Sequence, residues 1–506
     1  MRQEVLRMER VSCVEQDVIQ LEDFNLSIFS GQIMGLLPVN NHGLTALLKL
    51  LQYNTPLRYG YVYYREEQVN TWRTAKQRYN RIGLIQSESC LVEDLTVADN
   101  IFVLRQGFQP WLVQPSILRR QLLPFLESID IFISADSYVG DLSQFERLVV
   151  AVLKSVVAGY RLIVLRDISA SLSETELRKV HRLLNHYAGQ GLSFLYVDFH
   201  FEELCQVCHE VALMSNGRII KVLKSDAATP ETFQHYTKVY SGKVRQQIIK
   251  NGTADKVRKL VFEMAHIRGD CIHDLSFQAA AGECVVLQDV DHQIFGELLS
   301  IICGETEAKS GVIRLMGNVI LPSPGSEIAV VQELPTKTML FEEMSYLDNL
   351  CFSLDHRLPE VWSSNSVREG IRREYTPLLG SEVFDQRIDM LSEMQKYELV
   401  YHRVAIQRPK VAFCIQPFRR ADMEMRMHIW EQLKMLLDQE IAVVILAVTL
   451  ADSLSLADRL IRIQKGKAGE VYERHNFHTM SISAPWLKLY QDAYPQTEDA
   501  FCGGYI

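Results

Sequence analysis

The sequence lacks any long hydrophobic run. The longest unbroken apolar stretch, IAVVILAV at 441–448, has eight residues, whereas a helix that spans a membrane needs about 20. The opening residues, MRQEVLRMERVSCVEQD, contain no apolar segment of the kind found in a secretory signal. We therefore expect neither a signal peptide nor a membrane span, and we expect a cytoplasmic protein.

The chain also lacks an excess of positive charge. Its 53 Lys and Arg residues face 62 Asp and Glu residues, which gives a formal net charge of -9. Nucleic-acid-binding proteins carry basic patches, and no polybasic tract occurs here, so no nucleic-acid partner is expected. Hydrophobic residues make up 47% and charged residues 23% of the 506 residues, a composition typical of globular domains.

The ten cysteines are scattered, which is typical of reduced thiols in a cytosolic protein. Cys205, Cys208 and His209 match the CxxCH pattern of c-type haem attachment. That attachment normally needs an exported chain. We therefore expect instead a helix end that carries two small apolar thiols, and no metal site.

An internal repeat divides the chain into two halves. FSGQIMGLL and AAGECVVLQ align Gly31 with Gly282, an offset of 251 residues, and an offset of 249 then aligns LTVADN with MSYLDN. A missed repeat would misplace the whole fold. We expect a first domain over 1–240, a polar linker over 241–256 and a homologous second domain over 257–506.

Strands and helices alternate within each half. In SQFERLVVAVLKSVVAG the apolar residues recur at i, i+3, i+4 and i+7, which predicts a helix with one buried face. Ser173 and Glu176 form a capping box that opens another helix, and Asn216-Gly217 predicts a tight hairpin. A helical insert is expected at about 105–140. The alternation indicates α/β units with mainly parallel sheets.

The order of these segments resembles the ATP-binding-cassette (ABC) ATPases, and in particular the tandem-cassette subunits of bacterial carbohydrate importers. The resemblance covers nearly the whole chain and implies two tandem P-loop NTPase-like domains, each with a mainly parallel sheet, a helical insert and antiparallel β-hairpins. The first-half segments that carry it are SGQIMGLLPVNNHGLTALLKLL for the P-loop, RIGLIQSESCLVEDLTVADNIFVL for the Q-loop, DLSQFERLVVAVLKSV for the signature helix, YRLIVLRDISASLSETE for Walker B and VALMSNGRIIKV for the terminal hairpin.

The phosphate-binding loop implied by this resemblance is incomplete. In such a loop, glycines let backbone N–H groups contact phosphates, a lysine reaches the β- and γ-phosphates, and Ser or Thr binds Mg²⁺. Gly43 and Thr45 match, but Pro38 replaces the first glycine and Leu44 replaces the lysine. A lysine about 4 Å from a phosphate contributes about 4 kcal/mol, so its loss is expected to weaken binding roughly 1,000-fold.

The Walker B segment has lost its metal-binding carboxylate. Arg166 stands where an acidic Mg²⁺ ligand is expected, and Asp167 stands where the family has the glutamate that polarises the attacking water. Asp167 keeps a carboxylate on a shorter side chain and is the remnant of a catalytic residue. The alternative is a loop carboxylate that pairs with Arg166.

The other motifs of the first half are partly kept. The signature retains its serine, but a Gln-Phe pair replaces the glycines that would approach the γ-phosphate. Phe199 replaces the switch histidine, and His200 lies one residue out of register and is expected on a helix surface. No catalytic residue is intact. The weak remnants of a nucleotide site are Asn40, Gly43, Thr45, Gln86 and Ser143.

The second half departs further from the family pattern. Phe295 stands in place of the basic residue, and Asp289 and Asp291 add negative charge beside any phosphate. The second signature reads LSEM, and Ile415 and Gln416 replace the Walker B pair.

Two main classes of function stay open. The leading interpretation is an ATPase-inactive tandem cassette that serves as a scaffold or regulator, with weak or absent ATP binding and no Mg²⁺. The alternative is a divergent but active ATPase that energises carbohydrate import. An unrelated α/β enzyme is a weaker third interpretation, because no Ser-His-Asp, paired-carboxylate or Cys/His metal spacing supports it.

The Q-loop regions supply a candidate partner surface. In the family that the chain resembles, a groove beside the Q-loop receives a short helix from a membrane permease. The resemblance therefore implies a permease partner, besides a homodimer or a second cassette protein, and a peripheral position on the inner face of the cell membrane. The alternative is a core beneath a loop. The apolar residues expected to line the groove are Leu91, Leu95, Val97, Phe102, Met344, Leu347 and Leu350.

Overall fold

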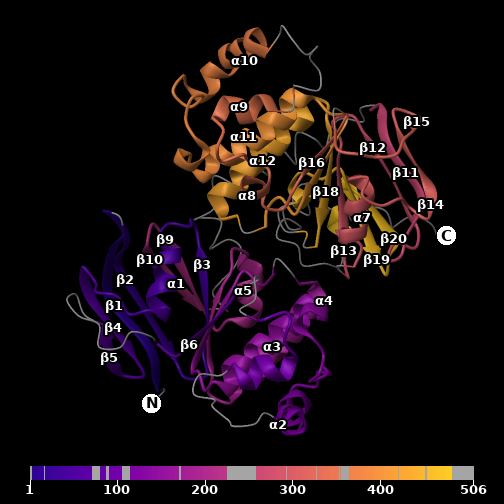
Figure 1. Cartoon of the computed structure of the whole chain (residues 1–506). Helices are drawn as coiled ribbons and strands as arrows, with labels where there is room; N and C mark the ends of the chain where they lie inside the picture. The colour runs from indigo at the N-terminus through magenta and orange to yellow at the C-terminus, as the bar shows by residue number, and fades with distance from the viewer. Residues whose placement is uncertain are drawn as a thin grey trace, which may run out of the picture. The chain divides into compact units, whose positions relative to one another are not determined.

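The computed structural model describes most of the two halves. The described residues are 3–224 and 258–480, except 16, 71–79, 87–90, 105–113, 170–171, 292, 326, 353, 355–363, 420, 449 and 451–452. The chain forms two compact units, one built mainly from each half (Figure 1). The expected linker at 241–256 lies outside the described residues, so its bounds and those of the two domains stay a prediction.

The first unit combines two sheets. A four-stranded antiparallel sheet has the order β2-β1-β4-β5, and a six-stranded sheet has the order β10-β9-β3-β8-β7-β6. In the larger sheet all neighbours are parallel except the hairpin β9-β10. The strands are β1 Glu4–Glu15, β2 Val18–Phe29, β3 Ile33–Pro38, β4 Tyr59–Tyr64, β5 Glu67–Asn70, β6 Ile82–Gln86, β7 Leu162–Arg166, β8 Ser193–Val197, β9 Glu210–Ser215 and β10 Arg218–Lys224. The helices are α1 Leu44–Gln52, the π-helix η1 Asp99–Val103, α2 Pro115–Ser128, the 3₁₀ turn η2 Val139–Asp141, α3 Gln144–Val157, α4 Glu174–Gly189 and α5 Phe201–Val207.

The second unit repeats this architecture. Its sheets have the orders β12-β11-β14-β15 and β16-β17-β18-β13-β19-β20, and the larger one read backwards matches the first unit strand for strand. The strands are β11 Leu260–Arg268, β12 Leu275–Ala280, β13 Cys284–Asp289, β14 Ser310–Leu315, β15 Asn318–Val319, β16 Ile328–Val331, β17 Val411–Ile415, β18 Ala442–Ala447, β19 Arg459–Gln464 and β20 Lys467–Glu473. The helices are α7 Phe295–Ile302, α8 Pro335–Thr338, α9 Tyr346–Cys351, α10 Ser364–Leu379, α11 Glu393–Gln407 and α12 Met423–Asp438, with 3₁₀ turns η6 Ile388–Met390, η7 Ser453–Ser455 and η8 Arg474–Thr479. The predicted α/β fold and its duplication are confirmed.

The larger sheet of the first unit lies between two hydrophobic cores. Side chains alternate along a strand, so Ile33 and Leu37 of β3 pack with α3 and α4. Met34 and Leu36 face the other way and pack with α1 and the antiparallel sheet. Because both faces are covered, β3 is buried at every position. The carboxyl edge of the sheet is therefore where functional side chains can emerge.

Several local predictions are confirmed. Ser173 caps α4 and Glu176 closes the predicted capping box. Asn216 and Gly217 form the β9-β10 turn with φ angles of 48° and 72°. Cys205 lies in α5 as expected, and the cysteines within the described part of the chain are free thiols.

The second unit buries a histidine. His402 of α11 is 2% exposed, and its ring lies 5.2 Å from the ring of Tyr375. Burial, with a smaller contribution from His428, lowers the pKa of His402 to about 4. The folded protein therefore holds this imidazole neutral at pH values where an unfolded chain binds a proton.

This histidine predicts a pH dependence of stability. Above pH 6.5 neither state protonates the ring, so its full stabilisation is present there; it is lost as the pH falls from about 6.5 to about 4. A pKa lowered from 6.5 to about 4 corresponds to about 3 kcal/mol in the free energy of unfolding. Urea unfolding at several pH values should show that the free energy of unfolding falls less with pH in His402→Gln than in the unaltered chain. The exposed His475→Gln is the control, and an equal pH slope in all three proteins would contradict the assignment.

Candidate functional site

Of the predicted site residues of the first unit, Asn40, Gly43, Thr45 and Gln86 follow or end strands at the carboxyl edge of its larger sheet, whereas Ser143 lies at the start of α3. In the parallel register, Gln86 at the end of β6 lies opposite Arg166 at the end of β7. Arg166 in turn lies opposite Val197 of β8, and β8 pairs with β3, which leads into the P-loop segment. Ligands of open α/β sheets bind at this edge. The fold thus brings together Gln86, Arg166, Asp167 and the residues after β3.

Gly43 is required by the turn that starts α1. Its φ is 80°, in the left-handed region, and a Cβ there would lie 2.2 Å from the carbonyl oxygen of Gln20 and 3.0 Å from the Cα of Gly217. Only glycine fits such a position. The loop therefore packs closely on its own unit, and Thr45 is exposed in the first helical turn.

Asn40 is engaged by the neighbouring hairpin. Its side-chain Nδ2 donates to Oδ1 of Asn216 at 2.7 Å, and its Oδ1 accepts the backbone N–H of Asn216 at 3.1 Å. These reciprocal bonds join the P-loop segment to the β9-β10 turn. Asn40 therefore has a structural role that the sequence did not suggest.

Leu44, at the lysine position, belongs to the hydrophobic core. It is 0% exposed and packs in the same cluster as Leu21, Phe24 and Met34. The first turn of α1 is thus held by apolar contacts beneath the antiparallel sheet. In the second unit, Phe295 opens α7 in the same way and is 7% exposed within a hydrophobic cluster.

Asp167 adopts a backbone conformation that its counterpart shares. Its φ is 54°, it is 5% exposed, and its N–H donates to the carbonyl of Val197 at 2.9 Å. Gln416, offset by 249 residues, has φ 42° and donates from its N–H to the carbonyl of Leu446, also at 2.9 Å. The Walker B alignment is therefore reproduced by the geometry, although the side chains differ.

A buried carboxylate at this edge was missed by sequence analysis. Asp198 follows β8 and is 0% exposed. It accepts hydrogen bonds from the Ser169 hydroxyl at 2.5 Å and from the His200 backbone N–H at 2.8 Å, and its Oδ1 lies 3.2 Å from Nδ1 of His200. Burial by itself would raise the pKa of Asp198, but the interactions with His200 and then Ser169 outweigh it, so the pKa is lowered. A polar residue directly after the buried strand LSFLYV was the available signal.

The switch position is apolar as expected, but His200 is not on a helix surface. Phe199 is 5% exposed and packs in the core. His200 is the residue before α5, half-buried and oriented by Asp198. The expectation of a surface helix residue was therefore wrong, because the buried Asp198 draws the ring inward.

Both signature helices begin with complete capping boxes. Ser143 accepts the N–H of Glu146, while the Glu146 carboxylate accepts the N–H and hydroxyl of Ser143, each at 2.9 Å. Ser392 and Gln395 make the same pair at α11. The retained serines thus serve as helix caps.

The acidic residues after β13 are engaged within the second unit. Asp289 is 1% exposed, and its Oδ2 accepts the N–H of Ile294, just before α7, at 2.8 Å. Asp291 accepts the N–H of Lys465 at 2.7 Å. The chain's own carboxylate therefore occupies a backbone donor at the start of α7, where a phosphate-binding helix would present its N–H groups.

The expected partner groove is largely core. Four of its seven residues are buried, namely Leu91, Val97, Phe102 and Leu350. The other three, Leu95, Met344 and Leu347, are half-buried. The prediction that all seven line an open groove was wrong, because most of them hold the Q-loop segments onto the helical inserts.

Other apolar side chains emerge beside these segments. Val92 and Leu104 in the first unit are 44% and 42% exposed, and Phe341 and Phe352 in the second are 41% and 45% exposed. The rings of Phe341 and Phe352 contact each other, with centroids 4.3 Å apart and planes tilted by 39°. Sequence periodicity could not separate these exposed positions from their buried neighbours.

The described residues hold neither a metal cluster nor a membrane-spanning helix. They contain no group of three or more His, Cys, Asp or Glu side chains able to hold a metal ion. No helix in the described part of the chain is both long and apolar enough to cross a bilayer.

Each unit places a strand, a turn and a helix at the carboxyl edge of a mainly parallel sheet, with an antiparallel sheet and a helical insert in the same unit, as in an ATPase-type cassette. Only the turn of the first unit contains a glycine, Gly43. The family model "ABC transporter" matches residues 21–167. A putative ribose/galactose/methyl galactoside import ATP-binding protein of Agrobacterium fabrum is 24% identical over 488 residues, which cover 95% of this chain and 97% of that protein. A ribose import ATP-binding protein of Streptococcus agalactiae is 22% identical, covering 89% and 93%.

A solved ATP-binding cassette of an ABC transporter, in its ADP conformation, covers 44% of this chain and 93% of its own, with 16% identity and a TM-score of 0.39. The relatives match at their full length, so the tandem arrangement is theirs as well. The chain is thus similar over nearly its whole length to import ATP-binding proteins, and its residues 21–167 match the ABC transporter family model.

The burial of Leu44 predicts the effect of restoring a lysine. Leu44→Lys would place an ammonium in the apolar core, which costs about 3 kcal/mol or more in the free energy of unfolding. Leu44→Met keeps volume and polarity and should cost less than about 1.5 kcal/mol. Urea unfolding of both variants measures the difference. A lysine variant as stable as the methionine variant would show that the side chain at this position escapes the core.

Proposed function

We propose that this protein is an ABC subunit related to carbohydrate importers in which neither nucleotide site hydrolyses ATP, and that it acts as a scaffold or regulator bound to a membrane permease. The sugar connection rests on the relatives, which are named as ribose and galactose import ATP-binding proteins. The lack of hydrolysis rests on the side chains at the carboxyl edges of the two sheets.

The observation that carries the proposal is the pair formed by Leu44 and Arg166. Leu44 is fully buried where a lysine would contact phosphate, and Arg166 ends β7 where a carboxylate would bind Mg²⁺. A cation at the metal position repels a second cation. The first site therefore does not fit Mg²⁺-ATP. Metal-free binding of a nucleotide is compatible with Gly43, the exposed Thr45 and Gln86.

The second unit supports the same conclusion. Asp289 already accepts a hydrogen bond from the segment that starts α7, and a phosphate placed there would meet a buried carboxylate. Phe295 occupies the position of the basic residue and is buried. Ile415 and Gln416 supply no carboxylate for a metal at the end of β17.

The permease contact is proposed on the exposed side chains beside the two Q-loops. Val92 and Leu104 in one unit, and the contacting pair Phe341 and Phe352 in the other, offer apolar surface that a short amphipathic helix would cover. A protein held in this way lies on the cytoplasmic face of the membrane. A second copy of this chain or a second cassette protein would be an alternative partner for these exposed side chains.

Hydrolysis is the property that tests this proposal. We expect the purified chain to release phosphate from Mg²⁺-ATP no faster than buffer, and no faster than its Asp167→Asn variant. The reason is that, without a bound metal and a lysine to activate the phosphate, the Asp167 carboxylate cannot promote hydrolysis. A coupled phosphate-release assay measures the rate. Turnover in the unaltered chain that Asp167→Asn abolishes would instead identify an active importer ATPase.

A further inference from the structure

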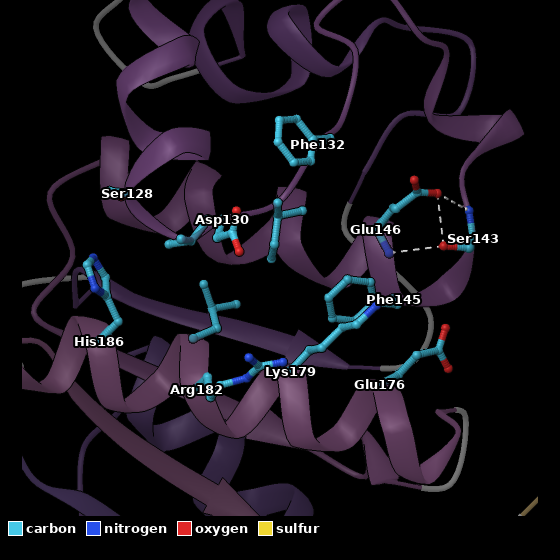
Figure 2. A pocket seen from close by; sticks show the side chains of 13 residues that line it. Ser128, Asp130, Phe132, Ser143, Phe145, Glu146, Glu176, Lys179, Arg182 and His186 are labelled. Atoms are coloured by element: carbon cyan, nitrogen blue, oxygen red, sulfur yellow. Dashed lines mark hydrogen bonds between the residues drawn. The ribbon is translucent and has the colours of Figure 1, made fainter.

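A cavity of about 700 Å³ opens within the first unit, away from the P-loop segment. Its walls are the turn after α2, the start of α3 and one face of α4 (Figure 2). The residues that line it are all described, and none of them belongs to the loop between β3 and α1 or to the ends of β6 and β7. Of the remnant nucleotide-site residues only Ser143, the cap of α3, reaches its wall.

The α4 wall is basic. Lys179 and Arg182 are three residues apart, so they lie on one helical face, and both line the cavity. Among the described residues neither side chain forms an ion pair within 4 Å. Lys179 instead holds its Nζ 5.4 Å from the ring centroid of Phe145, on the α3 side of the cavity.

The carboxylates in the lining are mostly engaged elsewhere. Glu146 accepts the N–H and hydroxyl of Ser143, and Glu176 accepts those of Ser173 at 2.8 Å. Both therefore serve as helix caps. Asp130, in the turn after α2, is the third carboxylate. The lining thus carries two cations that form no ion pair within the described part of the chain, and three carboxylates, two of which are engaged in helix caps.

The opposite wall, the turn after α2, carries apolar side chains beside Asp130. Phe132 is 92% exposed and stands across the cavity from α4 (Figure 2). Burying a large aromatic side chain away from water is favourable in free energy. An exposed phenylalanine beside a cavity is therefore suited to contact an aromatic ring of a ligand. A ligand that reaches from Phe132 to Arg182 would need an apolar part at one end and an anionic group at the other.

We propose that this cavity binds an organic anion in which a phosphate or carboxylate is joined to an apolar ring. Lys179 and Arg182 hold the anionic group by charge-assisted hydrogen bonds, and Phe132 and Phe145 contact the ring. This inference does not depend on whether either nucleotide site is active.

Titration of the full-length protein with 1-naphthyl phosphate, followed by the fluorescence anisotropy of the probe, tests the site. We expect saturable binding to one site per chain below about 1 mM. Inorganic phosphate and 1-naphthol each carry half of the recognised chemistry, and each should bind at least about tenfold more weakly.

Three variants and a control locate the probe. Lys179→Gln and Arg182→Gln should each weaken binding about tenfold, because each removes a charged hydrogen-bond donor, and Phe132→Ala should weaken it severalfold. Arg178→Gln, on the same helix but outside the cavity lining, should bind like the unaltered chain. All four positions are exposed, and circular dichroism confirms their folding.

The binding measurements on these variants either support or overturn the site. Loss of affinity in the three cavity variants with retention in Arg178→Gln supports the site. No saturable binding, binding of 1-naphthol as tight as that of the phosphate, or equal loss in Arg178→Gln and Arg182→Gln would each overturn the proposal.

Discussion

The burial of an apolar side chain at the first residue of α1 and of α7 is the constraint on which both units depend. Leu44 and Phe295 occupy equivalent positions in the repeat and are 0% and 7% exposed. Each anchors the start of its helix in the core that joins the parallel sheet to the antiparallel sheet. A side chain committed to the core cannot also contact a phosphate. The same position therefore stabilises the start of each helix.

Backbone N–H groups at helix starts in both units donate hydrogen bonds to carboxylate oxygens of the chain itself. Asp289 accepts the N–H of Ile294 before α7, and Glu146 closes the cap of α3. Such contacts satisfy backbone groups that helix ends leave unpaired. What both units keep is the scaffold: identical strand orders, left-handed residues after β7 and β17, and capped signature helices.

Sequence alone was sufficient for the elements and their order, because helical periodicity, capping boxes and the Asn216-Gly217 turn are local signals. It was not sufficient for contacts made by distant segments. Asp198 was missed because Ser169 and His200 meet it only in the fold. Leu91 and Val92 are adjacent and both apolar, yet one is 8% and the other 44% exposed. Composition cannot distinguish them, since burial depends on how the helical insert packs.

The central claim is that the chain keeps the cassette fold without its metal-dependent nucleotide chemistry. Isothermal titration calorimetry with ATP, in the presence and absence of Mg²⁺, tests it most directly. With Arg166 at the metal position, the account predicts that Mg²⁺ leaves the affinity for ATP unchanged or weakens it. An affinity that rises about tenfold or more when Mg²⁺ is added would contradict it.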